Sequence, residues 1–560
     1  MKILESKIFQ IFLILVLTFP AVKALFHPGF FPSQDGEWMV IRLSAFHQEL
    51  FSGQFPVRFT SRLNHGYGYP VFNFLYPLPF YLGEVFYLFL GNFQNAVKAV
   101  FILSFLISGI FMHLWMREKV GDLGGLVSAL VYTYTPYRFL DVYVRGSIGE
   151  ATAFIFPPII FWAIDRIGKK DRIKLYLAIG ALSYSALLVS HNVMGLIFTP
   201  LFFVYFLFLL FKTKKNWKNP TLWAYPLFII LSLSLSCFFW LPALFEKKYV
   251  YFDKVLVSNF FLHFPTLRQL IVPRWGFGPS VPGEADLMSF QIGLLNLIVF
   301  FLWLALTISC LLKKIKIDPG RFKIGLFFFF AFGLSSFLML ENSRPFWKGL
   351  MIFNLIQFPW RLLALTCFSS SVIAGILVSF LPGKLRLLTT FGVIGLAIFF
   401  NLPYTKPEYF VNRGEGFYTT NEGTTTVANE YMPVWVKKPL FQRAEEKVEI
   451  ISGRGEVKDL SLGFKKIKFR TESKVPLKIK INTVYFPGWK VFVDGDQKEI
   501  EYEENNGLVV FNLSPGEHRV EAVFGETALR LFADWVSIIS LLVVATTIIR
   551  IIVETKIRNF

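Results

Sequence analysis

Repeated apolar runs long enough to cross a bilayer constrain this chain more than any other feature. Stretches of about 17 to 25 residues with few or no charges recur along the 560 residues, and such runs are typical of membrane-spanning helices. They predict twelve spans, near residues 8–25, 95–115, 122–138, 150–166, 173–190, 192–211, 222–244, 288–312, 322–341, 361–382, 386–402 and 530–552. We therefore expect an α-helical polytopic membrane protein.

The short connections between these spans are basic, and this assignment places all of them on the side of the N-terminus. They are residues 117–119, 166–174, 212–218, 313–323 and 384–386. Short basic loops stay in the cytoplasm, so both termini are predicted to be cytoplasmic in a cell membrane. The formal charge of +19 comes from these scattered clusters, and no nucleic-acid partner is expected.

The first apolar run allows two interpretations. Lys2 and Lys7 precede it, and Val22-Lys23-Ala24 loosely resembles a signal-peptidase site. The run continues through Leu25 and many further spans follow, which favours a retained anchor helix. The three cysteines, Cys237, Cys310 and Cys367, lie inside apolar runs, where packing is the expected role.

The apolar stretch 71–90 is not counted as a span. It contains Pro77, Pro79 and Glu84, and counting it would move every basic connection to the wrong side. Its composition suits helices that lie in the membrane interface. The first outer loop is then large, about residues 26–94.

Residues 404–529 change to a polar, alternating pattern that predicts strands near 465–469, 477–481, 490–493, 508–511 and 518–524. We expect an extracytoplasmic β domain, a sandwich, before the last span. The predicted division is 1–403 for the transmembrane part, 404–529 for the β domain and 530–560 for the final helix and tail. Aromatic residues of this part, including Trp435 and Trp489, could stack on sugars, but packing inside the sandwich is favoured.

Two carboxylates, Asp35 and Glu37, open the first outer loop. Each could serve as a general base, or the two together as ligands of a divalent metal such as Mg or Mn. The alternative is that they only cap the helix that starts at Trp38.

The outer segments carry arginine, whereas the inner connections are mostly lysine. Guanidinium groups bind phosphate through two parallel hydrogen bonds, so Arg138, Arg145 and Arg361 are candidate phosphate-binding residues. Pairing of Arg145 with Asp141 or Glu150, and interface anchoring by Arg361, are the simpler alternatives.

His191 and Asn192 form a polar hinge between two spans on the same face. The pair could contact a sugar hydroxyl or cap helix ends, and capping is slightly favoured. Asp141 and Glu150 are further candidates for substrate contact.

The chain resembles the GT-C class of membrane glycosyltransferases in its first helix, its large first outer loop opening on an Asp, and its many spans. It is similar, more closely, to a prokaryotic membrane family labelled 6-pyruvoyl-tetrahydropterin-synthase-related, with YfhO-like glycosyltransferases as relatives. The matching segments are 33–59 with Asp35, Arg145-Gly146-Ser147, Phe358-Pro359-Trp360-Arg361, Glu430 to Trp435 and Tyr485 to Trp489. No three-histidine zinc site supports pterin chemistry.

The resemblance implies transfer of a sugar from a polyprenyl-phosphate donor to a glycan, lipid or protein acceptor at the outer face, with inversion. Asp35 matches the position of the class's first-loop Asp and would act as base, while Arg145 or Arg361 would neutralise the phosphate. A transporter of lipid-linked sugars and a non-catalytic scaffold that binds glycan are the competing hypotheses.

Overall fold

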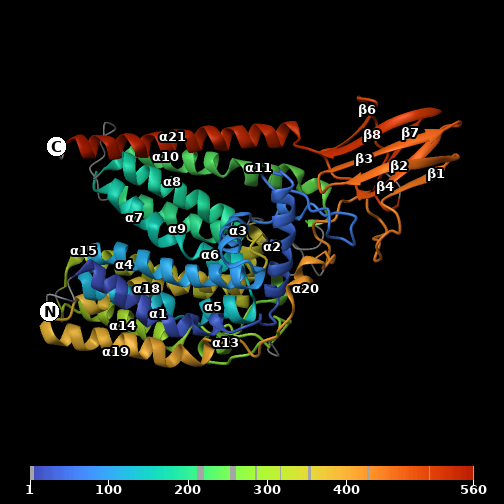
Figure 1. Cartoon of the computed structure of the whole chain (residues 1–560). Helices are drawn as coiled ribbons and strands as arrows, with labels where there is room; N and C mark the ends of the chain where they lie inside the picture. Colours follow the sequence, from blue (N-terminus) through green and yellow to red (C-terminus); the bar gives the residue numbers. More distant parts are fainter. Residues whose placement is uncertain are drawn as a thin grey trace.

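The computed structural model describes residues 6–170, 172–210, 220–252, 260–283, 287–315, 317–350, 353, 355–424, 428–502 and 505–558. Long helices run side by side in a bundle, with both chain termini at one end (Figure 1). The strands form a separate body beyond the opposite end of the bundle (Figure 1). We call these the terminus side and the strand side. The basic connection predicted at 212–218 lies outside the described residues.

The bundle consists of long, mostly apolar helices. They are α1 (Lys7–Val22), α4 (Phe93–Thr133), α7 (Phe156–Gly168), α8 (Ile173–Ser190), α9 (Asn192–Leu210), α10 (Pro220–Leu235), α11 (Cys237–Glu246), α14 (Leu294–Leu311), α15 (Pro319–Leu338), α18 (Leu363–Ser379), α19 (Gly383–Asn401) and α21 (Ala528–Arg558). Within the described ranges, ten helical segments are long and apolar enough to cross a membrane, and the bent pair α10–α11 makes eleven. The predicted helical membrane architecture is confirmed.

Helix α4 is a hairpin and not one straight helix. Gly121 breaks it with φ 80° and ψ 175°, a conformation open mainly to glycine. A Cβ built on Gly125 would lie 2.8 Å from the backbone nitrogen of Arg117, so the two arms meet closely at the turn. The turn at Gly121 thus separates the two apolar runs predicted near residues 95–115 and 122–138.

The first outer loop holds two helices at the strand side, α2 (Gly36–Phe51) and α3 (Leu78–Leu90). Helix α2 runs across the end of the bundle (Figure 1). Helix α3 is apolar but has only 13 residues, about 20 Å at 1.5 Å per residue, which is too short to span. Leu88 and Phe89 are exposed on it, as expected of a helix in the membrane interface.

Shorter helices complete the connections: α5 (Pro136–Phe139), α6 (Ile148–Ala153), α13 (Leu267–Ile271), α16 (Arg344–Gly349) and α20 (Glu415–Thr419). The segment after α19 returns along the first outer loop, because Phe30 pairs with Val411 as an isolated bridge and His65 N donates to Glu422 O. This segment ties the loop to the strands.

The strands form two antiparallel sheets, ordered β1-β4-β7 and β2-β3-β8-β5-β6. Their bounds are β1 (Val448–Ser452), β2 (Gly455–Leu462), β3 (Lys466–Ser473), β4 (Leu477–Val484), β5 (Trp489–Val493), β6 (Asp496–Lys498), β7 (Leu508–Leu513) and β8 (Gly516–Phe524). Ile479 and Phe511 of one sheet and Val491 and Val520 of the other are fully buried, which gives the body an apolar core. The five predicted strands are present, whereas β1, β2 and β6 were not predicted.

Candidate functional site

Glu150 of α6 is the centre of a buried ion cluster at the strand side of the bundle. It is 0% exposed, and its Oε2 accepts a hydrogen bond from Tyr137 OH at 2.7 Å and lies 2.7 Å from Arg145 Nη1. Arg361 Nε is 3.0 Å from the other carboxylate oxygen, Oε1, although the two atoms are not aligned as a hydrogen bond. A carboxylate without water needs such partners.

Arg145 is shared between two acids. The same Nη1 atom lies 2.5 Å from Asp141 Oδ1, and the guanidinium lies over the Trp360 ring, 4.8 Å from its centroid. The π-helical turn η4 (Leu140–Val144) places Asp141 and Arg145 on one side. We call Asp141, Arg145, Glu150 and Arg361 the strand-side cluster. The sequence left open whether Arg145 pairs with Asp141 or with Glu150. In the structure Arg145 pairs with both.

The charge of the strand-side cluster is not simply balanced. Burial and the neighbouring Glu150 carboxylate raise the pKa of Asp141 well above its usual range, which favours its protonated form. Two guanidiniums then face one carboxylate. The cluster is suited to receive one further negative charge.

Arg361 connects the cluster to the start of α18. It lies in the short helical turn η8 (Pro359–Leu362), is 7% exposed, and donates through Nη1 to Ile356 O and Gln357 Oε1. Because the side chain is buried, it is not an interface anchor.

His191 lies beside the cluster, with Nε2 3.7 Å from Glu150 Oε1. Its Nδ1 accepts a hydrogen bond from Met194 N at the start of α9, which fixes the neutral tautomer with the proton on Nε2. Burial lowers the pKa of His191 to about 3, and the nearby guanidiniums act in the same direction. His191 therefore both caps α9 and faces the cluster, whereas Asn192 is exposed.

Asp35 is held against the cluster by its backbone. Asp35 N donates to Arg145 O at 2.8 Å, and Gln34 N donates to Val144 O at 3.0 Å. Gly146, at φ 66°, lies so close that a Cβ there would overlap the backbone of Gly36. Residues 110 positions apart in sequence, Asp35 and Arg145, thus share one site.

The Asp35 carboxylate makes no hydrogen bond or ion pair with any residue that the structure describes, and Asp35 is only partly buried. It occupies the N-cap position of α2, yet its side chain caps no backbone amide. Ser33 Oγ accepts from Gly36 N instead. The capping alternative therefore does not explain this carboxylate.

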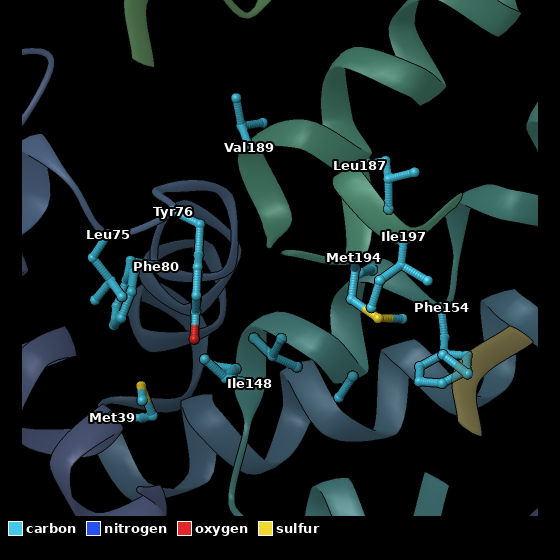
Figure 2. Close-up of a cluster of buried hydrophobic side chains, with 14 of the residues drawn as sticks. Met39, Leu75, Tyr76, Phe80, Ile148, Phe154, Leu187, Val189, Met194 and Ile197 are labelled. Atoms are coloured by element: carbon cyan, nitrogen blue, oxygen red, sulfur yellow. The ribbon is translucent and has the colours of Figure 1, made fainter. Parts of the chain in front are cut away.

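Tyr76 joins the first outer loop to the cluster. Burial and the nearby Asp35 carboxylate raise its pKa above the usual range, and its ring lies 4.9 Å from that of His191. Figure 2 shows its hydroxyl directed toward Ile148, near Met39, within an apolar group that includes Met194 and Ile197 of α9. Tyr76 thus packs among apolar side chains beside His191.

Glu37 faces away from this site, because its Oε1 lies 2.9 Å from Arg413 Nε and accepts from Tyr418 OH at 3.5 Å. No group of three or more His, Cys, Asp or Glu side chains suited to a metal occurs in the described ranges. Asp35 and Glu37 as arranged do not fit the metal site that their spacing suggested.

Arg138 is directed into the α4 hairpin. It donates to Ser108 Oγ and Ser104 O, and it lies among the rings of Phe105, Tyr132 and Phe154. These contacts are separate from those of Arg145 and Arg361.

An apolar groove of about 790 Å³ lies between α9 and α15. Its walls come from Leu196 and Val204 of α9 and from Phe330 and Leu334 of α15, among others. On the strand side the groove reaches Ile356 and Leu362, the residues that flank Arg361. A hydrocarbon chain in the groove would therefore end beside a buried guanidinium.

Four buried polar atoms of the site have no hydrogen-bond partner among the residues described: Asp141 Oδ2, Glu150 Oε1, Trp360 Nε1 and Arg361 Nε. Buried polar atoms normally have partners, and a ligand or water can supply missing ones. Tyr76, Tyr137 and Trp360 were not identified from sequence as site residues. The only signal was their position beside residues that were, such as Trp360 before Arg361.

The bundle and this site define a polytopic membrane protein with a buried ionic site at the strand side. Residues 72–308 are similar to the family described as "6-pyruvoyl-tetrahydropterin synthase related domain; membrane protein". An uncharacterised protein of Lactococcus lactis subsp. cremoris is 25% identical over 250 residues, which cover 44% of this chain and 40% of the relative. The match thus spans about two fifths of that relative's length.

Proposed function

We propose that this chain is a membrane glycosyltransferase that moves a sugar from a polyprenyl-phosphate carrier to an acceptor hydroxyl, with inversion at the anomeric carbon. One juxtaposition carries the proposal. The backbone of Asp35, whose carboxylate has no partner among the described residues, is hydrogen-bonded to Arg145, and the apolar groove reaches the residues beside Arg361 of the same ion cluster. A base, a phosphate-binding group and a place for a lipid tail are then adjacent.

In this reaction the acceptor oxygen attacks the anomeric carbon while Asp35 takes the hydroxyl proton. The bond from that carbon to the phosphate oxygen breaks, and the polyprenyl phosphate leaves with the bonding electrons. Arg361 and Arg145 stabilise the negative charge on the leaving phosphate. The tail in the groove orients the donor through contacts far from the reacting atoms.

The strand side is the extracytoplasmic face in this proposal. Both termini and the described basic connections lie on the opposite side (Figure 1), which the positive-inside rule assigns to the cytoplasm. The β domain, 404–529 in the predicted division, then faces the envelope together with the site.

Replacement of Asp35 tests the proposal. In cells that depend on this chain, Asp35→Asn should reduce incorporation of a labelled sugar into envelope glycan or lipid by at least about a hundredfold, the scale of general-base loss. The variant should remain in the membrane at the wild-type level, because the Asp35 side chain caps no backbone amide and the fold therefore does not depend on it.

Asp318→Asn is the matched control. Asp318 also occupies an N-cap position, where it accepts from Arg321 N, but it lies at the start of α15 on the terminus side. Its replacement should leave incorporation unchanged. Wild-type incorporation by Asp35→Asn would remove Asp35 as the base.

A further inference from the structure

A second polar cavity, of about 480 Å³, lies between the first outer loop and the strands. Its volume falls within the roughly 300–1,000 Å³ of small-molecule sites. None of its lining residues belongs to the strand-side cluster. They come from α2 (Gln48), the first outer loop (Ser61, Arg62, His65, Gly66, Tyr67), the end of α20 and the segment after it (Thr419, Thr420, Glu422), the segment before β1 (443–447), the end of β2 and the turn after it (Leu462, Gly463, Phe464), and β4 (Asn482).

The walls of this junction cavity are fixed to one another. Lys447 Nζ donates to Gly66 O at 2.6 Å and to Asn482 O at 2.7 Å, so one lysine joins the outer loop to β4. Val484 N donates to Tyr67 O at 2.7 Å. The cavity is therefore preformed, and binding there requires little ordering of the protein.

Two of the lining side chains carry a buried polar atom without a hydrogen-bond partner among the described residues, Arg62 Nε and Gln48 Oε1. The other guanidinium nitrogens of Arg62 are occupied by backbone and side-chain oxygens that include Ile41 O and Ser44 Oγ. One atom is a donor and the other an acceptor. A hydroxyl group can satisfy both kinds, because it donates and accepts.

The charges of the cavity oppose an anionic ligand. Three cationic side chains are matched by three acidic ones: Arg62, Arg443 and Lys447 against Glu422, Glu445 and Glu446. Phe464 is 41% exposed at the cavity and offers an apolar ring face. Balanced charge, unpartnered hydrogen-bonding atoms and an accessible ring are what a neutral sugar requires.

We propose that the junction cavity binds a neutral oligosaccharide segment, with sugar hydroxyls on the side chains of Arg62 and Gln48 and a sugar ring face on Phe464. Binding at this cavity does not require Asp35 and is distinct from sugar transfer. It would hold envelope glycan against the outer loop and the β domain together.

Binding is measured on the full chain in detergent by saturation-transfer NMR and titration. The probe is a partial acid hydrolysate of the producing organism's envelope polysaccharide, separated by ion exchange into neutral and charged oligosaccharides. The wild type should bind the neutral fraction. Gln48→Ala and Phe464→Ala should each weaken this binding about tenfold, through a lost hydrogen bond and a lost ring contact respectively.

Two control variants complete the experiment. Lys490→Ala, exposed on β5 and outside the cavity, and Asp35→Asn should both bind as the wild type does. Arg62 is not used, because it also holds backbone carbonyls and its loss could unfold the loop. The proposal would be overturned if the wild type bound only the charged fraction or neither fraction. It would also be overturned if Gln48→Ala and Phe464→Ala both bound the neutral fraction with wild-type affinity.

Discussion

Two buried ion clusters lie at opposite ends of the bundle, and they differ in how completely their polar atoms are paired. The terminus-side cluster consists of Asp165, Lys119, Trp115 and Tyr205. Asp165 Oδ1 accepts from Tyr205 OH at 2.8 Å, and Oδ2 accepts from Trp115 Nε1 at 2.6 Å and lies 2.6 Å from Lys119 Nζ. None of these four side chains has an unpartnered buried atom.

The strand-side cluster is incomplete by the same measure. Asp141 Oδ2 and Trp360 Nε1 have no partner in the described part of the chain, and the contact between Arg361 and Glu150 is not aligned as a hydrogen bond. A network that serves only the fold satisfies its members, as the terminus-side cluster does. The comparison therefore fits a structural role for the terminus-side cluster and supports the proposed ligand-binding role of the strand-side cluster.

The largest effect on stability is expected from Asp165→Asn. The change leaves the Lys119 ammonium buried without a counter-ion, at a cost of about 3–5 kcal/mol in the free energy of unfolding. Sugar transfer per folded molecule should stay at the wild-type value. Thermal unfolding in detergent, together with the transfer assay, measures both. If Asp165→Asn lost sugar transfer but kept the wild-type stability, the terminus-side cluster would have a functional role, and the contrast between the two clusters would be wrong.

Arg361→Gln should give the opposite result. Glu150 keeps Arg145 and Tyr137 as partners, so the fold should persist, while transfer falls roughly a hundredfold through loss of one charge-stabilising donor. Arg344→Gln is the control, because Arg344 lies on the same side but outside the cluster, with 38% of its side-chain surface exposed. If Arg361→Gln unfolds the protein and leaves transfer per folded molecule intact, the strand-side cluster is structural too.

Asp141→Asn is expected to have the smallest effect. Because the folded state favours protonated Asp141, a neutral Asn resembles it, and transfer at neutral pH should change less than about fivefold. The folded state binds more protons than the unfolded state above the usual Asp pKa, about 4, so this group's contribution to stability falls as pH rises. Asp141→Asn should flatten that fall, measured as melting temperature against pH. An unchanged slope would contradict the protonated assignment.

Much of the membrane architecture could be predicted from sequence, because apolar run length and loop charge follow directly from bilayer physics. The requirement that all basic connections lie on one side of the membrane correctly excluded residues 71–90 from the spans. Strand β2 was missed for a physical reason: nearly all of its residues are exposed, so the burial that produces alternation is absent.

The site was predictable only in part. Placing Asp35, Arg145 and Arg361 on one face followed from topology, and pairing of Arg145 with Glu150 was an alternative from sequence, but nothing in the sequence indicates that Arg361 also reaches Glu150. One Glu at the start of an apolar helix carries no spacing pattern. The junction cavity was not foreseen, because its walls come from six separate segments that only the folded chain brings together.

The groove offers the most direct test of donor binding. Gly333 lines it on α15, and a Cβ there would meet no atom within 4 Å, so Gly333→Trp should fill the groove without disturbing the fold. Gly392→Trp on α19, equally uncrowded but outside the groove, is the matched control.

The measurement is the rate of transfer of a labelled sugar from a long-chain polyprenyl-phosphate donor in proteoliposomes. We predict that Gly333→Trp reduces this rate at least about tenfold, the effect of roughly 1.4 kcal/mol of lost binding, whereas Gly392→Trp retains it. Equal rates for the two variants, or no transfer by the wild type, would contradict the account of a lipid-linked donor bound between α9 and α15.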